Sequence, residues 1–190
     1  IVIKSLLLRR STSLSMCCLC LLGALSAAGQ ASASCSSSEA GVLQLHREWI
    51  LQGWERRPED EAFDFRAKLG KFYDFDAPGV LLYDDFDVDH RVAHSAAQYG
   101  AFWTAPFNAL RSARHRVIDG PDVIATQDLA TSTLEFAARL EAADGAITAI
   151  RTRSTLVWHC TGQGWKIVRE HNSSRRVSEA EIDALLSAKE

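Results

Sequence analysis

The stretch from residue 151 to residue 173 constrains the fold of this chain most strongly. It contains two runs rich in Thr, Val, Ile and Trp, which fit the pleated, half-buried surface of a sheet. Between the runs lies Gly162-Gln163, with glycine first as a type II′ turn requires, so the stretch predicts a β-hairpin. The second run ends in ionisable and polar side chains, which indicate a curved sheet with a pocket at one end. These side chains are Arg169, Glu170, His171 and Asn172.

Composition and cysteine placement set the limits on the fold class. The 190 residues are 47% hydrophobic and 24% charged, which suffices for one domain with a substantial core. The net charge of −3 gives no basic face for nucleic acid. Of the five cysteines, only Cys160 lies in the body of the chain. We therefore expect neither an internal disulfide nor a zinc site, and a fold that depends on packing.

The first 38 residues differ in composition from the rest. A basic start is followed by an apolar run over residues 14–28 and by Ala31-Ser32-Ala33, the three-part pattern of a secretory signal peptide cleaved after Ala33. This pattern predicts a periplasmic or secreted protein; the alternative is a disordered or upstream-translated leader on a cytoplasmic protein. The apolar run is too short and too interrupted by serine for a membrane span of roughly 20 residues. We therefore expect no membrane association after leader removal.

Three amphipathic helices are predicted in the first half of the body. Apolar residues recur at three- and four-residue steps over 39–56, 58–73 and 96–110. Ser38 is a suitable N-cap for the first helix, and Ser95 with Gln98 forms a capping box for the third. A short strand, 80–83, separates the second helix from the third.

After the third helix the apolar period changes from 3.6 to two. Strands are predicted over 113–119 and 123–125, separated by a turn at 120–122, and then over 129–140 and 147–160. Asp144-Gly145 is a strong signal for a hairpin turn. Helices followed by strands indicate an α+β domain over residues 39–176. A tail over 177–190 follows, with a short helix that begins after Ser178.

Residues 84–94 combine alternating aspartates with two histidines. An EF-hand loop would need glycine and a carboxylate where His90 and Ala96 stand, so calcium binding of that kind is excluded. A looser metal site on Asp87, Asp89, His90 and His94 competes with a solvated acidic loop. We favour the loop and predict no metal and no cofactor.

Two segments of the hairpin resemble a known superfamily. Arg153-Ser-Thr-Leu-Val-Trp158 followed by Gly164-Trp165-Lys-Ile-Val-Arg-Glu-His171-Asn-Ser173 is similar to the ending of SnoaL-like proteins, a branch of the superfamily of nuclear transport factor 2 and ketosteroid isomerase. Residues 92–103 resemble its third helix. The resemblance covers residues 40–175 and implies a cone-shaped, curved antiparallel sheet wrapped around three N-terminal helices.

The same resemblance implies a small apolar, oxygenated ligand in the cone and homodimers formed through the outer face of the sheet. Cofactor-free proton transfer of the isomerase or cyclase type is the expected activity, and a non-catalytic ligand-binding or oligomerisation module is the alternative. The candidate catalytic residues are His171 and Asp64. The candidate ligand-binding residues are Arg153, Arg169, Tyr73, Tyr99 and Trp103. For each, a structural role competes: His171 as a hydrogen-bonded strand residue, Arg153 as a partner of Glu170, and the aromatic residues as core.

The register of the hairpin decides which side chains face the pocket. With Gly162-Gln163 as the turn, Trp158 pairs with Ile167, and Arg169 and His171 share a face with Trp165. Arg153 and Glu170 then point to the other face. A slip of one residue would reverse this assignment, so the sequence leaves both sets open.

Overall fold

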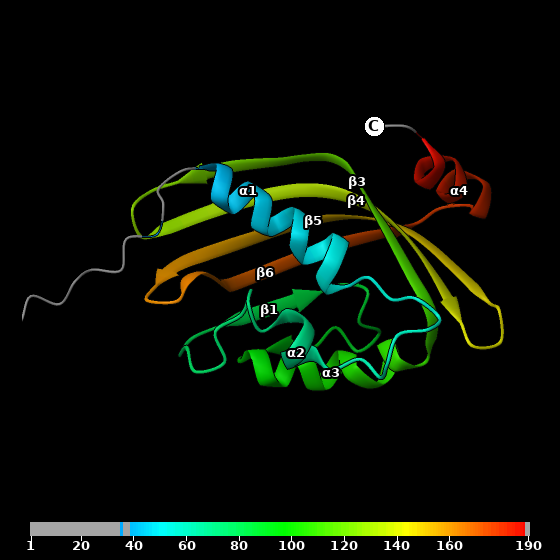
Figure 1. Cartoon of the computed structure of the whole chain (residues 1–190), viewed down its shortest axis with the longest axis horizontal. Helices are drawn as coiled ribbons and strands as arrows, with labels where there is room; N and C mark the ends of the chain where they lie inside the picture. The colour runs from blue at the N-terminus through cyan, green and yellow to red at the C-terminus, as the bar shows by residue number, and fades with distance from the viewer. Residues whose placement is uncertain (1–34, 36–38, 189–190) are drawn as a thin grey trace, which may run out of the picture. The chain divides into compact units, whose positions relative to one another are not determined.

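The computed structural model describes residue 35 and residues 39–188. Its centre is a curved six-stranded sheet with the order β2-β1-β6-β5-β4-β3 (Figure 1). The strands are β1 (Leu81–Asp84), β2 (Val92–Ala93), β3 (Leu110–Ala125), β4 (Leu129–Ala142), β5 (Ile147–Thr161) and β6 (Gly164–Arg176). The expected α+β fold is therefore confirmed. The predicted leader and the Ser38 cap lie outside the described residues.

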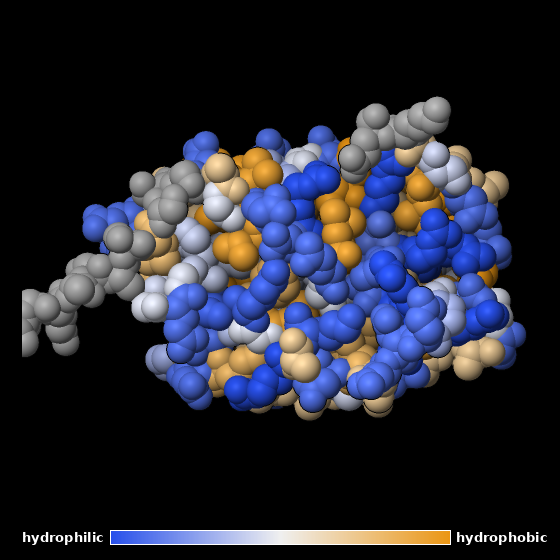
Figure 2. All heavy atoms as spheres, in the orientation of Figure 1, coloured by the Kyte–Doolittle hydropathy of each residue, from blue (hydrophilic) through white to orange (hydrophobic). Residues whose placement is uncertain are grey.

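Four α-helices accompany the sheet in the part of the chain that the structure describes. They are α1 (Glu39–Glu48), which continues into the π-helical turn η1 (Trp49–Gly53), α2 (Phe65–Leu69), α3 (Ala96–Asn108) and α4 (Glu179–Ser187). Figure 1 shows α1 crossing over the long strands, while α2 and α3 lie beside β1. No helix within the described ranges is both long and apolar enough to cross a membrane. In Figure 2 the face that carries α1 is mostly hydrophilic, with hydrophobic side chains visible in the gaps.

Helix α1 docks on the sheet through a buried histidine. The His46 ring is fully buried, with Nδ1 2.8 Å from the Ser132 hydroxyl and Nε2 3.2 Å from the Ser154 hydroxyl. Because Trp158 Nε1 donates to the Ser132 hydroxyl, that hydroxyl is free to donate to Nδ1, and Nε2–H then donates to Ser154. Burial lowers the pKa of His46 to about 3, so the ring stays neutral at neutral pH.

Most predicted strands and turns are confirmed. The hairpin of β5 and β6 turns at Gly162-Gln163, and β4 and β5 are joined across Asp144-Gly145. The predicted type II′ turn is wrong, because the glycine with a positive φ is Gly164 (93°) and not Gly162. Ser95 caps α3 by accepting from Gln98 N, and Ser178 caps α4 by accepting from Glu181 N. The predicted turn at residues 120–122 is wrong, because β3 runs on through it with only a shift in register against β4. The sheet is also mixed, since β1 pairs in parallel with β6.

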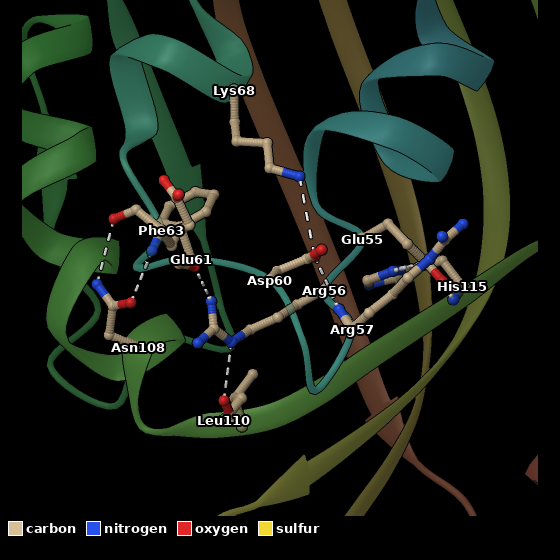
Figure 3. Close-up of polar contacts among 10 residues, drawn as sticks. All are labelled: Glu55, Arg56, Arg57, Asp60, Glu61, Phe63, Lys68, Asn108, Leu110 and His115. Carbon is tan, nitrogen blue, oxygen red and sulfur yellow. Dashed lines mark hydrogen bonds and ion pairs between the residues drawn. The ribbon is translucent and has the colours of Figure 1, made fainter.

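The second predicted helix, over 58–73, is much shorter than expected. Only Phe65–Leu69 is α-helical, and residues 57–64 form a loop (Figure 3). Side chains bind the backbone of this loop and so replace helical hydrogen bonds. The Asn108 side chain accepts from Phe63 N and donates to Phe63 O, while Arg56 donates to Glu61 O and to Leu110 O. Phe63, which this loop positions, is buried in the core.

Helix α4 packs on the outer face of the sheet. Its buried Ile182 contacts Ala137 and Ala149, which belong to a small cluster separate from the main core. Ala137 alternates along β4 with the core residues Phe136 and Ala138, so it points to the opposite face. Helix α4 therefore covers one end of that outer face.

A disulfide contradicts the expectation for Cys160. Cys35 and Cys160 are joined across 125 residues of sequence, with their Cα atoms 5.7 Å apart. The expectation failed because Cys35 was assigned to the leader, although it lies two residues beyond the predicted cleavage point. The fold therefore has a covalent crosslink in addition to its packed core.

Removing this crosslink should destabilise the protein. Replacing both cysteines, as Cys35→Ser with Cys160→Ser, should lower the free energy of unfolding by roughly 2–4 kcal/mol, because the long closed loop no longer restricts the unfolded chain. Urea unfolding with and without dithiothreitol measures this. Reductant should shift the wild type to the variant's midpoint and leave the variant unchanged. Equal midpoints for wild type and variant without reductant would contradict the crosslink.

Candidate functional site

A cavity lies between the helices and the concave face of the sheet. Its volume is about 220 Å³. Its lining is mostly apolar and comes from η1, α3, the end of β1, the four long strands and the segments that follow η1 and β1. The apolar and aromatic lining residues are Trp49, Ile50, Trp54, Phe86, Trp103, Pro106, Phe107, Leu110, Phe136, Ala138, Leu140 and Ile150. The polar ones are Asp84, His115, Thr148, Thr152, Asn172 and Ser174. An apolar pocket with few polar groups is typical of small-molecule sites.

A β-bulge in β6 decides which residues face this cavity. Val157 pairs with Arg169 but Trp158 pairs with Ile167, so Val168 is an extra residue in β6. One extra residue reverses the alternation of side chains beyond it. As a result, Glu170 and Asn172 are buried while Arg169 and His171 are exposed. The predicted Trp158–Ile167 pairing is confirmed, but the placement of Arg169 and His171 on the Trp165 face is wrong.

Glu170 is the centre of a buried hydrogen-bond network. Its two carboxylate oxygens accept from Tyr73 Oη at 2.5 Å and from Tyr99 Oη at 2.6 Å. Asn172 Nδ2 donates to Glu170 at 2.8 Å, and Trp49 Nε1 donates to the Tyr73 hydroxyl at 2.9 Å. The four side chains of this network around Glu170 come from η1, α3, β6 and the segment after α2. The network therefore ties η1, α3 and the segment after α2 to the last strand.

Burial dominates the acid–base properties of this network. It raises the pKa of Glu170 to about 7, although hydrogen bonds from Tyr73, Tyr99 and Asn172 oppose the rise. Burial, together with the nearby Glu170 charge, also raises the pKa values of Tyr73 and Tyr99 well above the ordinary value of 10. Both tyrosines thus remain protonated hydrogen-bond donors at neutral pH.

Asp84 brings a second carboxyl group into the cavity wall. Its Oδ2 accepts from Asn172 Nδ2 at 3.1 Å, and its Oδ1 accepts from Phe86 N at 2.9 Å. Burial raises the pKa of Asp84 to about 6. Asn172 donates to both Asp84 and Glu170, so one amide group connects the carboxyl group in the wall with the carboxyl group behind it.

His115 from β3 is the other titratable side chain in the lining. The side chain is 5% exposed, and Glu55 Oε2 lies 3.3 Å from Nδ1 and accepts from His115 N at 3.1 Å (Figure 3). A carboxylate only accepts, so Nδ1 carries the proton in this contact. Nε2 makes no hydrogen bond to any described residue and is the ring nitrogen left for a ligand.

Comparison with known proteins identifies the family of this fold. Residues 84–176 match the SnoaL-like domain family. A nuclear transport factor 2-like superfamily protein from Salmonella enterica serovar Typhimurium superposes with a TM-score of 0.57 at 12% identity, over 75% of this chain and 95% of that one. A SnoaL-like domain therefore lies within this chain at residues 84–176, and the fold is that of nuclear transport factor 2-like proteins. The predicted family is therefore confirmed.

Other solved structures share the fold at low sequence identity. The hub of calcium/calmodulin-dependent protein kinase II from S. rosetta has a TM-score of 0.53 at 20% identity, over 72% of this chain and 96% of that one. A protein with a cystatin-like fold from Caulobacter vibrioides has a TM-score of 0.52 at 13% identity, over 79% and 99%. A search of curated proteins found no significant match. At such identities the structures establish the fold alone.

Most of the predicted site residues lie outside the cavity of the SnoaL-like domain. Asp64 is exposed and caps α2 by accepting from Ala67 N. His171 is exposed on the outer face, edge-on to the Tyr83 ring. Arg153 is exposed beside Glu135, not paired with Glu170 as expected, because the bulge turns Glu170 inward. Arg169 is exposed and donates to Gly79 O. The geometry therefore does not support these four as cavity residues.

The predicted aromatic residues lie in or behind the cavity wall. Trp103 lines the cavity, whereas Tyr73 and Tyr99 lie behind its wall and hold Glu170. Asp84 and His115 were not predicted as site residues, although period-two alternation was a signal for both. Asp84 shares a strand face with buried Leu82, and His115 shares one with buried Ala113.

The acidic loop before α3 is organised by an arginine. Asp87 accepts from Arg91 Nε and Nη2, both at 2.8 Å, and from Arg91 N. These hydrogen bonds lower the pKa of Asp87 to about 2. Residue 35 and residues 39–188 contain no group of three His, Cys, Asp or Glu side chains arranged to hold a metal ion.

The raised pKa of Glu170 predicts how stability varies with pH. The folded protein retains the Glu170 proton between pH 4.5 and about 7, where the unfolded chain has lost it. The free energy of unfolding should therefore fall as pH rises through this window. Relative to Glu170→Gln, whose side chain does not titrate, the wild type should lose on the order of 3 kcal/mol between pH 5 and 8.

Urea unfolding of wild type and Glu170→Gln at each pH measures this difference. Both proteins contain His46, so its contribution cancels. Glu59→Gln, on an exposed residue, is the matched control and should give a difference that is flat with pH. A flat difference for Glu170→Gln would show that Glu170 titrates normally.

Proposed function

We propose that this SnoaL-like domain binds a small, mostly apolar oxygenated molecule in its cavity and catalyses cofactor-free proton transfer next to a carbonyl group. The observation that carries the proposal is the Asp84 carboxyl group in an apolar cavity wall, with its pKa raised to about 6. At neutral pH this carboxylate is ionised yet more basic than an ordinary aspartate. Those are the properties that a general base needs.

The residues that line the cavity indicate how the proton is transferred. The Asp84 carboxylate takes a proton from the carbon beside the carbonyl group, and the electron pair of that C–H bond forms an enolate. The protonated Asp84 then returns this proton to the enolate at a second carbon, which completes the isomerisation. His115 is the other titratable group in the lining, and its unprotonated Nε2 is suited to accept a hydrogen bond from the ligand. Asn172 fixes Asp84 through the Nδ2 contact at 3.1 Å. The reaction class is thus isomerisation or cyclisation through an enolate.

We also propose that the protein is exported and forms a homodimer, as the sequence predicts. The Cys35–Cys160 disulfide supports export, because disulfides persist in oxidising compartments. A homodimer through the outer face would use the part that α4 leaves open, where Arg153 and His171 are exposed. The S. rosetta hub that shares this fold is consistent with an assembling domain.

Replacing Asp84 should abolish catalysed proton exchange. The probe is 2-tetralone carrying deuterium beside its carbonyl group, and the readout is deuterium loss to water, followed by mass spectrometry. Wild type should accelerate this loss, and Asp84→Asn should reduce the catalysed rate by at least about 100-fold, because the amide cannot accept the proton. Asp122→Asn, on an exposed residue of β3, is the matched control and should keep the wild-type rate. No acceleration by wild type would favour the non-catalytic module, and full activity in Asp84→Asn would exclude Asp84 as the base.

The catalysed rate should also depend on pH through the same group. Asp84 accepts a proton only in its ionised form, so the rate of deuterium loss should rise with pH, reach half its maximum near pH 6 and level off above. The pH–rate profile of wild type, after subtraction of the buffer rate, measures this. A rate that is constant from pH 5 to pH 8 would mean that the base has the pKa of an ordinary aspartate.

A further inference from the structure

Helix α4 contacts the rest of the fold through a small apolar cluster of its own. Its buried Ile182 packs on Ala137 and Ala149, and this cluster is separate from the main core. The partly buried side chains around it are Ile118, Val177, Leu185 and Leu186. The core that surrounds the cavity therefore does not require α4 to stay on its own copy of the chain.

Arginines surround this apolar contact on the outer face of the sheet. One row across the four long strands consists of Arg116, Ala137, Arg151 and Arg175, since each pairs with the next. Arg139 shares the face of Ala137, because it lies two residues further along β4. The surface under α4 is thus basic with a small apolar centre. We call it the α4 bed, and it consists of Arg116, Ala137, Arg139, Ala149, Arg151 and Arg175.

The acidic residues of α4 complement the charge of the α4 bed. The ion pairs between helix and bed are Asp183–Arg139 at 3.3 Å, Glu181–Arg151 at 3.6 Å and Glu181–Arg175 at 3.7 Å. Near the end of the helix, Arg116 donates to Leu185 O at 3.0 Å, where helix carbonyl groups lack partners within the helix. The bed therefore binds an acidic helix with an apolar stripe and also fixes the direction of that helix.

The contacts that hold α4 on the bed are weak. The helix has nine residues, which is too short for a helix that is stable alone, so its helical form depends on the bed. The side chains of Glu181 and Asp183 are 41% and 59% exposed, so water and salt screen their ion pairs. Only Val177 and Ser178 connect β6 to α4. A terminal element with such a short connection is prone to exchange between copies of a chain.

We propose that two copies of this chain exchange α4, so that each helix lies on the α4 bed of the partner copy. The exchange reproduces between copies every contact that α4 makes with its own bed. The open part of the same outer face carries Ile124 and Leu129, which are 71% and 49% exposed, and a second copy buries this apolar area. The inference rests on the homodimer of the proposed function, and it does not require proton transfer.

A mixture of two charge-reversed variants of the full chain tests the exchange. The helix variant is Glu181→Arg/Asp183→Arg, and the bed variant is Arg139→Glu/Arg175→Glu. A homodimer of either variant places like charges together at both docking sites. A mixed dimer with exchanged helices has one native site, made from the native helix of one copy and the native bed of the other, and opposite charges at the second site. Co-refolding of the two variants from urea, followed by native mass spectrometry, measures the proportions of the three dimers.

Exchange should make the mixed dimer predominate. The ratio of mixed dimer to either homodimer should rise at least about tenfold above its statistical value of about two, because like charges held together at an interface weaken the homodimers. The control is a mixture of Glu59→Arg and Arg57→Glu, which reverse charges on exposed residues of the loop before α2. This mixture should give the statistical ratio.

Two outcomes would overturn the exchange, and they differ in what they mean for the homodimer. A statistical ratio for the charge-reversed mixture would show that α4 stays on its own copy, so the exchange fails and the homodimer stands. Monomers alone in every sample, wild type included, would remove the exchange and the homodimer together and leave the test of deuterium loss unaffected. If a charge-reversed variant does not fold alone, the mixture still decides, because a folded mixed dimer supports the exchange and its absence contradicts it.

Discussion

The buried Glu170 carboxyl group is the interaction on which the arrangement of helices and sheet depends. Tyr73 and Tyr99 reach it from the segment after α2 and from α3, and each donates a short hydrogen bond to a different carboxylate oxygen. Breaking one of these contacts would leave a buried polar group unpaired, so the network penalises any shift of the helices against the last strand. The cavity that these segments enclose with the sheet thus has a wall fixed by polar contacts as well as by apolar packing.

The direction in which Glu170 points could not be predicted from the sequence. Strand alternation places Arg169 and His171 with Trp165, and it fails because Val168 is an extra residue in β6. No residue in Trp165-Lys-Ile-Val-Arg-Glu170 marks the bulge, since charged residues occur on both of its sides and the stretch contains no glycine. This one extra residue turns Arg169 and His171 outward and Glu170 and Asn172 inward. The positions of the hairpin turns were predictable from local glycine residues, although the type of the β5–β6 turn was not, whereas no local pattern predicted the bulge.

The predictions for the second helix and for Cys160 failed for a similar reason. The sequence of residues 58–73 has helical spacing, but Asn108 binds the loop backbone at Phe63 from 45 residues away. Arg56, which binds the loop at Glu61 O, is itself fixed by a contact with Leu110 O from 54 residues away. Likewise, Cys35 finds its partner only once the sheet brings the start of the domain beside Cys160. Local spacing predicted Ser95 and Ser178 as caps because their partners lie three residues away. Contacts between residues far apart in the sequence leave no comparable pattern in that sequence.

Two buried ionisable groups oppose each other in the pH dependence of stability. His46 has a lowered pKa of about 3, so its contribution to stability is lost as pH falls through 6.5 and below. Glu170 has a raised pKa of about 7, so its contribution is lost as pH rises from 4.5 through 7. Asp84, whose pKa is raised to about 6, also destabilises the fold as pH rises, so the His46 slope offsets only part of the combined slope of the two carboxyl groups between pH 4.5 and 6. At higher pH the Glu170 slope persists to about pH 7, and the tyrosines that hold this carboxylate also fix the cavity wall.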